Sequence, residues 1–263
     1  MFGLHRKSAF SLVELSIVLV ILGLLTGGIL GGQALIRAAE IRSVSAEQQR
    51  YIAAAQTFRD KYFAVPGDMT NATAFWGDNN SQCPNAAIAN GTPGTCNGNG
   101  NGLLDFGSVA GGTAEFAQFW NQLAYAGLVE GNYTGLSCPA NTFCATIGTD
   151  SPRSKLSNAG WSASSYPNGY AGDASTFAGS WGNALFFGAP HPLNGALNPI
   201  LKPEEAWNID TKADDGRPGT GKIIAFYWNN ACANAASATD NANAQYRLDD
   251  ANVRCALAFV QQF

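Results

Sequence analysis

A long apolar run near the N-terminus constrains this chain more than any other feature. The run extends from Phe10 to Gly32, and it follows a short polar segment that contains Arg6 and Lys7 but no acid. It is long enough to cross a bilayer as a helix, which takes about 20 residues. The basic residues before it favour a cytoplasmic N-terminus. Only Glu14 interrupts the run, and a carboxylate there is costly unless it has a partner or lies at the membrane interface.

Two general interpretations of the run fit it incompletely. A secretory signal peptide has an apolar core of about 7–15 residues followed by a small-residue cleavage site. This run is longer, and the first such site lies beyond Gly32, around residues 34–39. A plain signal anchor fits the length but gives Glu14 no role.

The residues around Glu14 support a third interpretation. The string Lys-Ser-Ala-Phe-Ser-Leu-Val-Glu-Leu, residues 7–15, resembles the processing site of type IV prepilins and type II secretion pseudopilins. In that family a short basic leader is cut off before a phenylalanine, and the new N-terminus is methylated. The resemblance implies a leader of residues 1–9 and cleavage between Ala9 and Phe10. The family usually has glycine before the cut, and the alanine found here is also a small residue.

The resemblance also gives Glu14 a role in assembly. Cleavage before Phe10 creates a positive amine inside the apolar segment, and in the family this amine is thought to meet the glutamate of a neighbouring subunit. Such a pair lowers the cost of burying both charges only when the subunits are in register. The alternative is a carboxylate that merely reaches the membrane edge.

The apolar run continues into an amphipathic segment, residues 33–62. Its apolar residues recur at helical spacings of three, four or seven. They are Ile41, Val44, Tyr51, Ala55, Phe58 and Tyr62. The segment Pro66–Asp68 is expected to end the helix. By resemblance to pilins, residues 10–32 would form the membrane or filament-core half of one long helix, and residues 33–62 the half that packs on a globular domain, residues 63–263.

The remaining residues predict an α+β fold, with the helix packed on a mostly antiparallel sheet and long Gly/Asn-rich loops. Helices are expected over residues 113–125 and 203–207, and strands over residues 184–187, 222–228 and 253–260.

The six cysteines favour disulfides. They are Cys83, Cys96, Cys138, Cys144, Cys232 and Cys255. None forms a C-x-x-C pair and no histidine is near one, so a zinc site is poorly supported. An even count behind an export signal favours disulfides over buried thiols. Sequence does not choose among the possible pairings, although purely local pairing would join 83 to 96, 138 to 144 and 232 to 255.

An oxygen-rich segment resembles the first half of an EF-hand calcium loop. Asn97, Asn99 and Asn101 place side-chain oxygens at alternate positions, and Asp105 follows. Ser108 stands where the bidentate acid belongs, so affinity should be weak unless other residues complete the shell. Calcium sites occur in pseudopilin globular domains, and we therefore expect no required cofactor but a possible Ca²⁺ ion. A plain Asn-Gly turn is the alternative.

Three further motifs have simpler interpretations. The acidic stretch of residues 210–216 could bind a cation, but a turn capped by side chains is favoured. The GxxxxGK match that ends at Lys222 is followed by Ile223, which lacks the hydroxyl that a nucleotide site requires. A loose nucleophile motif at Ser180 has only His191 as a possible base. The sequence therefore does not favour an enzyme.

Exposed aromatic residues would favour a different function. Trp161, Tyr166, Tyr170 and Trp181 lie in Ser/Gly-rich sequence and could face outward. Such residues would suit a membrane-anchored, extracytoplasmic module that binds carbohydrate or another surface without polymerising.

The favoured prediction is a structural subunit of a type IV pilus or type II secretion filament. The formal net charge of −4 argues against a nucleic-acid-binding protein. The resemblance implies three kinds of partner: other pilin subunits, a prepilin peptidase that is also a methylase, and an inner-membrane assembly platform. It implies residence in the bacterial inner membrane before assembly and in a periplasmic or extracellular filament afterwards.

Overall fold

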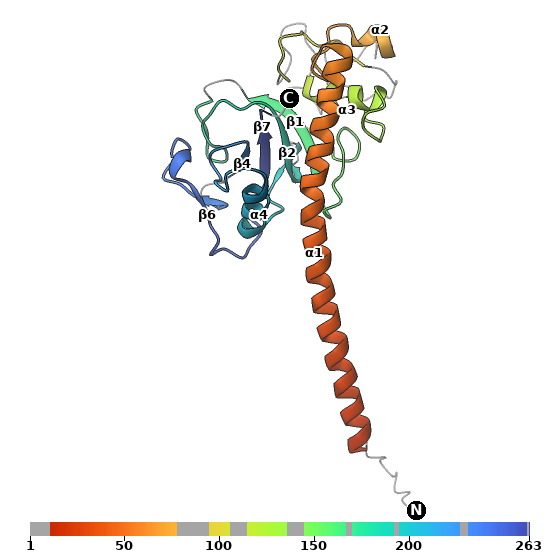
Figure 1. The fold of residues 1–263 in the computed structure, drawn as a ribbon, viewed down its shortest axis with the longest axis vertical. Helices are drawn as coiled ribbons and strands as arrows, with labels where there is room; N and C mark the ends of the chain where they lie inside the picture. The colour runs from red at the N-terminus through yellow and green to blue at the C-terminus, as the bar shows by residue number, and fades with distance from the viewer. Residues whose placement is uncertain are drawn as a thin grey trace, which may run out of the picture. The chain divides into compact units, whose positions relative to one another are not determined.

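The computed structural model describes residues 11–77, 95–105, 115–135, 145–166, 170–191, 195–226, 231–261 and 263. The chain divides into two compact units, residues 1–40 and 41–263. The helices are α1 (Leu12–Tyr62), α2 (Ala72–Trp76), α3 (Glu115–Tyr125), α4 (Pro203–Ala213) and the 3-10 helix η2 (Asn241–Asn243) (Figure 1). The strands are β1 (Gly160–Tyr166), β2 (Gly182–His191), β3 (Gly195–Asn198), β4 (Ile223–Ala225), β5 (Ala233–Asn234), β6 (Gln245–Tyr246) and β7 (Leu257–Val260).

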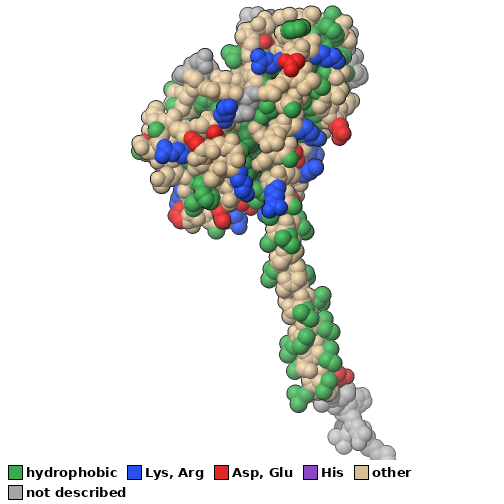
Figure 2. All heavy atoms as spheres, in the orientation of Figure 1, with side chains coloured by type: hydrophobic (Ala, Val, Ile, Leu, Met, Phe, Trp, Pro, Cys, Tyr) green, Lys and Arg blue, Asp and Glu red, His purple; other side chains and the backbone are tan. Residues whose placement is uncertain are grey.

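The first unit is the N-terminal part of α1. Among the described helices, α1 is the one long and apolar enough to cross a membrane, with a mean hydropathy of 2.4 over its most apolar window. None of that window is buried within the chain. Figure 2 shows hydrophobic side chains along this part of the helix, and Leu24, for example, is 73% exposed. The predicted helix is thus confirmed from Leu12 onward, and the described residues leave the apolar surface of its N-terminal part exposed.

The second unit begins with the amphipathic end of α1. Val44, Tyr51, Ala55 and Phe58 are buried there, as the spacing predicted. The helix ends at Tyr62, the predicted last residue of the amphipathic segment 33–62. The next residue already has a left-handed backbone with φ 54°, which cannot continue an α-helix.

The main sheet is antiparallel throughout. Its order is β1-β2-β7-β4, and β3 pairs with the C-terminal end of β2. Strands β5 and β6 form a separate two-stranded sheet. The α+β fold, with a helix packed on an antiparallel sheet, is therefore confirmed. His191 is the last residue of β2.

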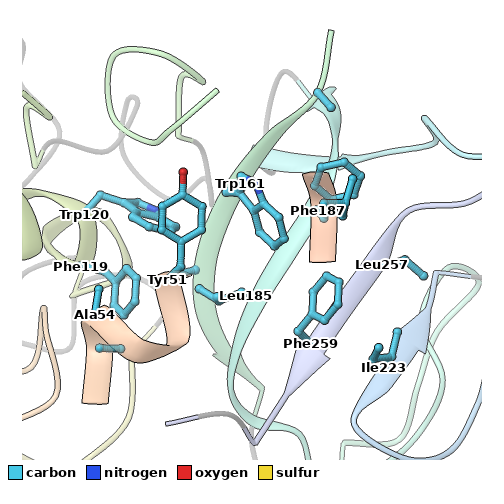
Figure 3. Close-up of a cluster of buried hydrophobic side chains, with 14 of the residues drawn as sticks. Tyr51, Ala54, Phe119, Trp120, Trp161, Leu185, Phe187, Ile223, Leu257 and Phe259 are labelled. Atoms are coloured by element: carbon cyan, nitrogen blue, oxygen red, sulfur yellow. The ribbon is translucent and has the colours of Figure 1, made fainter. Parts of the chain in front are cut away.

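Alternate residues of the central strands face two hydrophobic clusters. The first cluster receives Leu185 and Phe187 from β2 and Phe259 from β7, and the helices α1, α3 and α4 also contribute to it. Figure 3 shows Tyr51 of α1 between Trp120 and Trp161, with ring centroids 4.8 Å and 5.5 Å away. The second cluster lies on the other face, where Phe186, Ile224 and Ala258 meet Phe177 and Trp181.

This core corrects the expectation of outward-facing tryptophans. Trp161 is fully buried and Trp181 is 3% exposed, and Tyr166 and Tyr170 are half-buried. Strand β1 explains the error, because Ser162 and Ser164 alternate with Trp161 and Ala163, and the latter two residues belong to the first cluster. Ser165 Oγ donates to the carbonyl oxygen of Leu104 at 2.8 Å.

One expected disulfide is present. Cys232 and Cys255 are bonded, with Cα atoms 4.9 Å apart, and they join the segment before β5 to the segment before β7. Cys96 is also disulfide-bonded. Cys83, Cys138 and Cys144 lie outside the described residues, so the other two pairings stay predictions.

Candidate functional sites in the N-terminal helix and the loop 97–105

Glu14 lies in the exposed first turn of α1 and caps that helix. The backbone nitrogen of Ser11 donates to Glu14 Oε2 at 2.9 Å, and Ser11 Oγ accepts from the backbone nitrogen of Val13 at 3.3 Å. The pattern Ser-x-x-Glu is a capping box, in which the two side chains bind N–H groups that the start of a helix leaves unpaired. The sequence contained this signal in the spacing of Ser11 and Glu14. The predicted processing residues Ala9 and Phe10 lie outside the described residues.

The loop 97–105 is held by two buried carboxylates from outside it. Asp68 Oδ1 accepts from the backbone nitrogen of Gly100 at 2.6 Å, and its Oδ2 accepts from that of Gly102 at 2.7 Å. Glu115, the first residue of α3, accepts from the backbone nitrogens of Asn99 at 2.8 Å and Asp105 at 3.1 Å. Sequence reasoning missed both acids, because each is distant in sequence from most of the groups it binds.

The predicted calcium ligands are only partly brought together. Asn99 and Asn101 each donate from Nδ2 to Asp105 Oδ2, at 2.8 Å and 2.7 Å. Their Oδ1 atoms accept from the backbone nitrogens of Asn101 and Leu103. Asn97 Oδ1 instead accepts from the backbone nitrogen of Thr73 at 2.9 Å.

This arrangement bears directly on cation binding. Calcium takes oxygen ligands, whereas the amide nitrogens of Asn99 and Asn101 face Asp105 here. An ion beside Asp105 would need both amides to turn over and release their backbone partners. The calcium site therefore stays a prediction, and the fold adds Asp68 and Glu115 as nearby carboxylates.

Burial also changes the acidity of this cluster. Burial raises the pKa of Glu115 to about 7, and the charges of Asp68 and Asp105 act in the same direction. The hydrogen bonds from the backbone nitrogens of Asp105 and Asn99 lower this pKa but do not outweigh the burial. Burial likewise raises the pKa of Asp68, against the backbone N–H groups of Gly102 and Gly100 that lower it.

The second acidic cluster forms the expected turn. Asp210, Asp214 and Asp215 have carboxylate oxygens within 4.8 Å of one another. Asp210 accepts from the Tyr246 hydroxyl at 2.8 Å, Asp214 from the backbone nitrogen of Ile223 at 2.9 Å, and Asp215 from Thr220 Oγ1 at 2.7 Å. Asp210 thus ties α4 to β6, while Asp214 and Asp215 tie the end of α4 to β4 and to the loop before it.

The GxxxxGK match that follows this cluster leads into a strand. Lys222 immediately precedes β4, as expected, whereas a phosphate-binding loop of this type begins a helix.

A third buried carboxylate, Glu47, was also not recognised from the sequence. Glu47 of α1 is 5% exposed and accepts from Ser154 Oγ at 2.7 Å, the backbone nitrogen of Lys155 at 2.8 Å and Trp161 Nε1 at 2.8 Å. Its position midway between Val44 and Tyr51, on the buried stripe, was the signal. The three bonds fix the register of α1 against β1 and the loop before it.

The comparisons with known proteins identify the N-terminal segment. No curated protein and no solved structure is significantly similar to the chain. Residues 4–30 match the family model described as the prokaryotic N-terminal methylation motif. The chain therefore carries the signature of type IV pilins and pseudopilins, as the residues around Glu14 predicted.

Proposed function

We propose that this protein is a non-enzymatic structural subunit of a type IV pilus or a type II secretion filament. The observation that carries the proposal is the methylation motif over residues 4–30, joined to a helix whose most apolar part is not buried by any of the described residues. A water-soluble protein seldom exposes so continuous an apolar surface, since each buried Å² of such surface contributes about 25 cal/mol.

The apolar part of α1 has two successive environments in this proposal. The bacterial inner membrane covers it before assembly, and the helices of neighbouring subunits cover it in the filament. A prepilin peptidase removes residues 1–9 and methylates Phe10, and an inner-membrane platform passes the subunit into the filament. The unit of residues 41–263 remains on the periplasmic or extracellular side.

Glu14 exchanges partners during assembly. In the monomer its carboxylate binds the backbone nitrogen of Ser11. In the filament, the methylated amine of a neighbouring Phe10 competes for the same carboxylate. A charge pair in a low-dielectric environment is stronger than a bond to a neutral N–H group, and it forms only when the two subunits are in register.

The binding-module alternative has less support. Its main argument was a set of outward-facing aromatic residues, and Trp161 and Trp181 are instead core residues.

The experiment is an assembly assay with Glu14→Gln in the native host. We expect a processed subunit that stays in the membrane and is nearly absent from sheared or detergent-resistant filaments. Glu40→Gln is the matched control, because it makes the same change on the same helix at a residue whose ion pair with Arg37 spans 3.7 Å at the surface. Equal incorporation of both variants would contradict the proposed role of Glu14, and absence of the wild-type chain from every filament fraction would contradict the proposed function.

A further inference from the structure

The loop 97–105 contains three consecutive Asn-Gly steps, at residues 97–98, 99–100 and 101–102. An Asn-Gly step is the sequence most prone to deamidation, because glycine has no side chain to hinder the approach of its own nitrogen. That nitrogen loses its proton and attacks Cγ of the asparagine, so a C–N bond forms and the side-chain amide leaves as ammonia. Water then opens the cyclic imide to aspartate or isoaspartate.

Each glycine nitrogen in these steps donates a hydrogen bond. Gly100 and Gly102 donate to the two carboxylate oxygens of Asp68, at 2.6 Å and 2.7 Å. Gly98 donates to the carbonyl oxygen of Met69 at 2.9 Å. A nitrogen whose proton faces a buried carboxylate cannot lose that proton easily, because an anion would form beside another negative charge.

The attacked side chains are held as well. The amides of Asn99 and Asn101 are bound at both ends, by a backbone nitrogen and by Asp105 Oδ2. Imide formation requires each Cγ to turn toward the following nitrogen, so it must break bonds at both the side chain and the backbone.

We propose that Asn99 and Asn101 form a deamidation site whose reaction Asp68 suppresses. The reaction consumes water and releases ammonia, and needs no other reactant. The two asparagines become reactive when the hydrogen bonds that Gly100 and Gly102 donate to Asp68 are lost. Asn97 differs from the other two, since the nitrogen that would attack it is bound to a backbone carbonyl and not to Asp68.

Deamidation changes the chemistry of the loop. It replaces an amide nitrogen that donates to Asp105, at 2.7–2.8 Å, with a carboxylate oxygen that repels it. The modified loop therefore either opens or takes up a cation between the carboxylates. If the chain forms the proposed filament and the filament persists outside the cell, where no new synthesis replaces it, the deamidated fraction at this site would increase with the age of the subunit.

The test is site-resolved mass spectrometry of the full-length protein, incubated folded in mildly alkaline buffer. In Asp68→Asn we expect deamidation at Asn99 and Asn101 to be at least about tenfold faster than in wild type, the factor that one hydrogen bond to a charged group contributes. Asn97 should change little, and it is the internal control. Asp60→Asn, an exposed change in the same unit, should leave all three rates unaltered.

Two results would overturn the proposal. One is an unchanged rate at Asn99 and Asn101 in a folded Asp68→Asn protein. The other is an equal acceleration at all three asparagines, since that would indicate general opening of the loop.

A second measurement decides the matter if Asp68→Asn does not fold. Wild type is compared with itself in urea, and amide hydrogen exchange is followed at Gly100 and Gly102. The proposal requires slow exchange at both amides and deamidation at Asn99 and Asn101 that is at least about tenfold slower in the folded chain. Fast exchange at these amides, or equal rates in folded and unfolded chains, would overturn it.

Discussion

Replacing Glu47 by glutamine should destabilise the globular unit far more than its conservative shape suggests. The side chain keeps its size, so no cavity forms and the effect isolates the hydrogen bonds. Glutamine has one accepting oxygen where glutamate has two. Ser154 can reverse its hydroxyl and accept from the new amide, but Trp161 Nε1 and the backbone nitrogen of Lys155 can only donate. One of these two buried donors must therefore face an amide N–H.

The magnitude follows from that count. The variant loses at least one bond to a charged acceptor, which contributes about 1.5–3 kcal/mol, and the donor it leaves unpaired adds a desolvation penalty of about 1–3 kcal/mol. Because neighbouring side chains can relax, we expect the free energy of unfolding to fall by about 2–4 kcal/mol.

The assay is urea unfolding of the full-length chain in mild detergent, followed by tryptophan fluorescence and near-ultraviolet circular dichroism. The matched control is Glu130→Gln, an exposed change in the same unit, which should alter stability by no more than about 0.5 kcal/mol. A loss in Glu47→Gln below about 1 kcal/mol, or equal to that of the control, would refute the argument that these bonds position α1.

Three further predictions concern the acids, the asparagine loop and the disulfide. The pKa of Glu115 is raised from 4.5 to about 7, so the stability that Glu115 contributes is full below pH 4.5 and is lost as the pH rises through about 7. The difference between the urea midpoints of wild type and Glu115→Gln should therefore fall over this pH range, and a difference that does not change with pH would contradict the prediction. The variant Asn99→Asp/Asn101→Asp should bind calcium about tenfold more tightly than wild type, because affinity follows ligand charge; titration calorimetry checks this, and equal affinities would remove the calcium prediction. Changing Cys232 and Cys255 to serine should lower the free energy of unfolding by about 2–4 kcal/mol, and a thermal midpoint equal to that of wild type would show that the bond does not stabilise this fold.

Sequence predicts α1 well because one physical rule governs it. The apolar run and the spacing of Val44, Tyr51 and Phe58 follow from hydrophobic burial alone, and each of these three residues is buried. Glu47 lies on the same stripe, and a rule that counts only apolar residues overlooks it. Its position on the stripe predicts that it is buried, but its partners Ser154 and Trp161 come from distant sequence and cannot be predicted from it.

The sheet shows where sequence patterns mislead. The Ser/Gly-rich sequence of strand β1 predicted outward-facing aromatic residues, yet even its serines are buried and hydrogen-bonded. Helix α4 was expected to end at Trp207 but continues to Ala213, since Ile209 and Asp210 extend its buried face. In both elements, tertiary contacts decide the structure against local composition.

The loop 97–105 was recognised for its asparagines, but the residues that fix it were not. Asp68 and Glu115 bind it through backbone nitrogens, and any residue type except proline offers such a group. A pattern of side-chain types therefore does not predict these contacts.

The most direct test of the filament account is the N-terminus and intact mass of the protein isolated from its own cells. The account predicts a chain that begins at methylated Phe10 and has lost residues 1–9. A chain that begins beyond Gly32 would show that the apolar run is a signal peptide, and a chain that keeps Met1 would leave Ala9 uncut. Either of these two results would contradict the account.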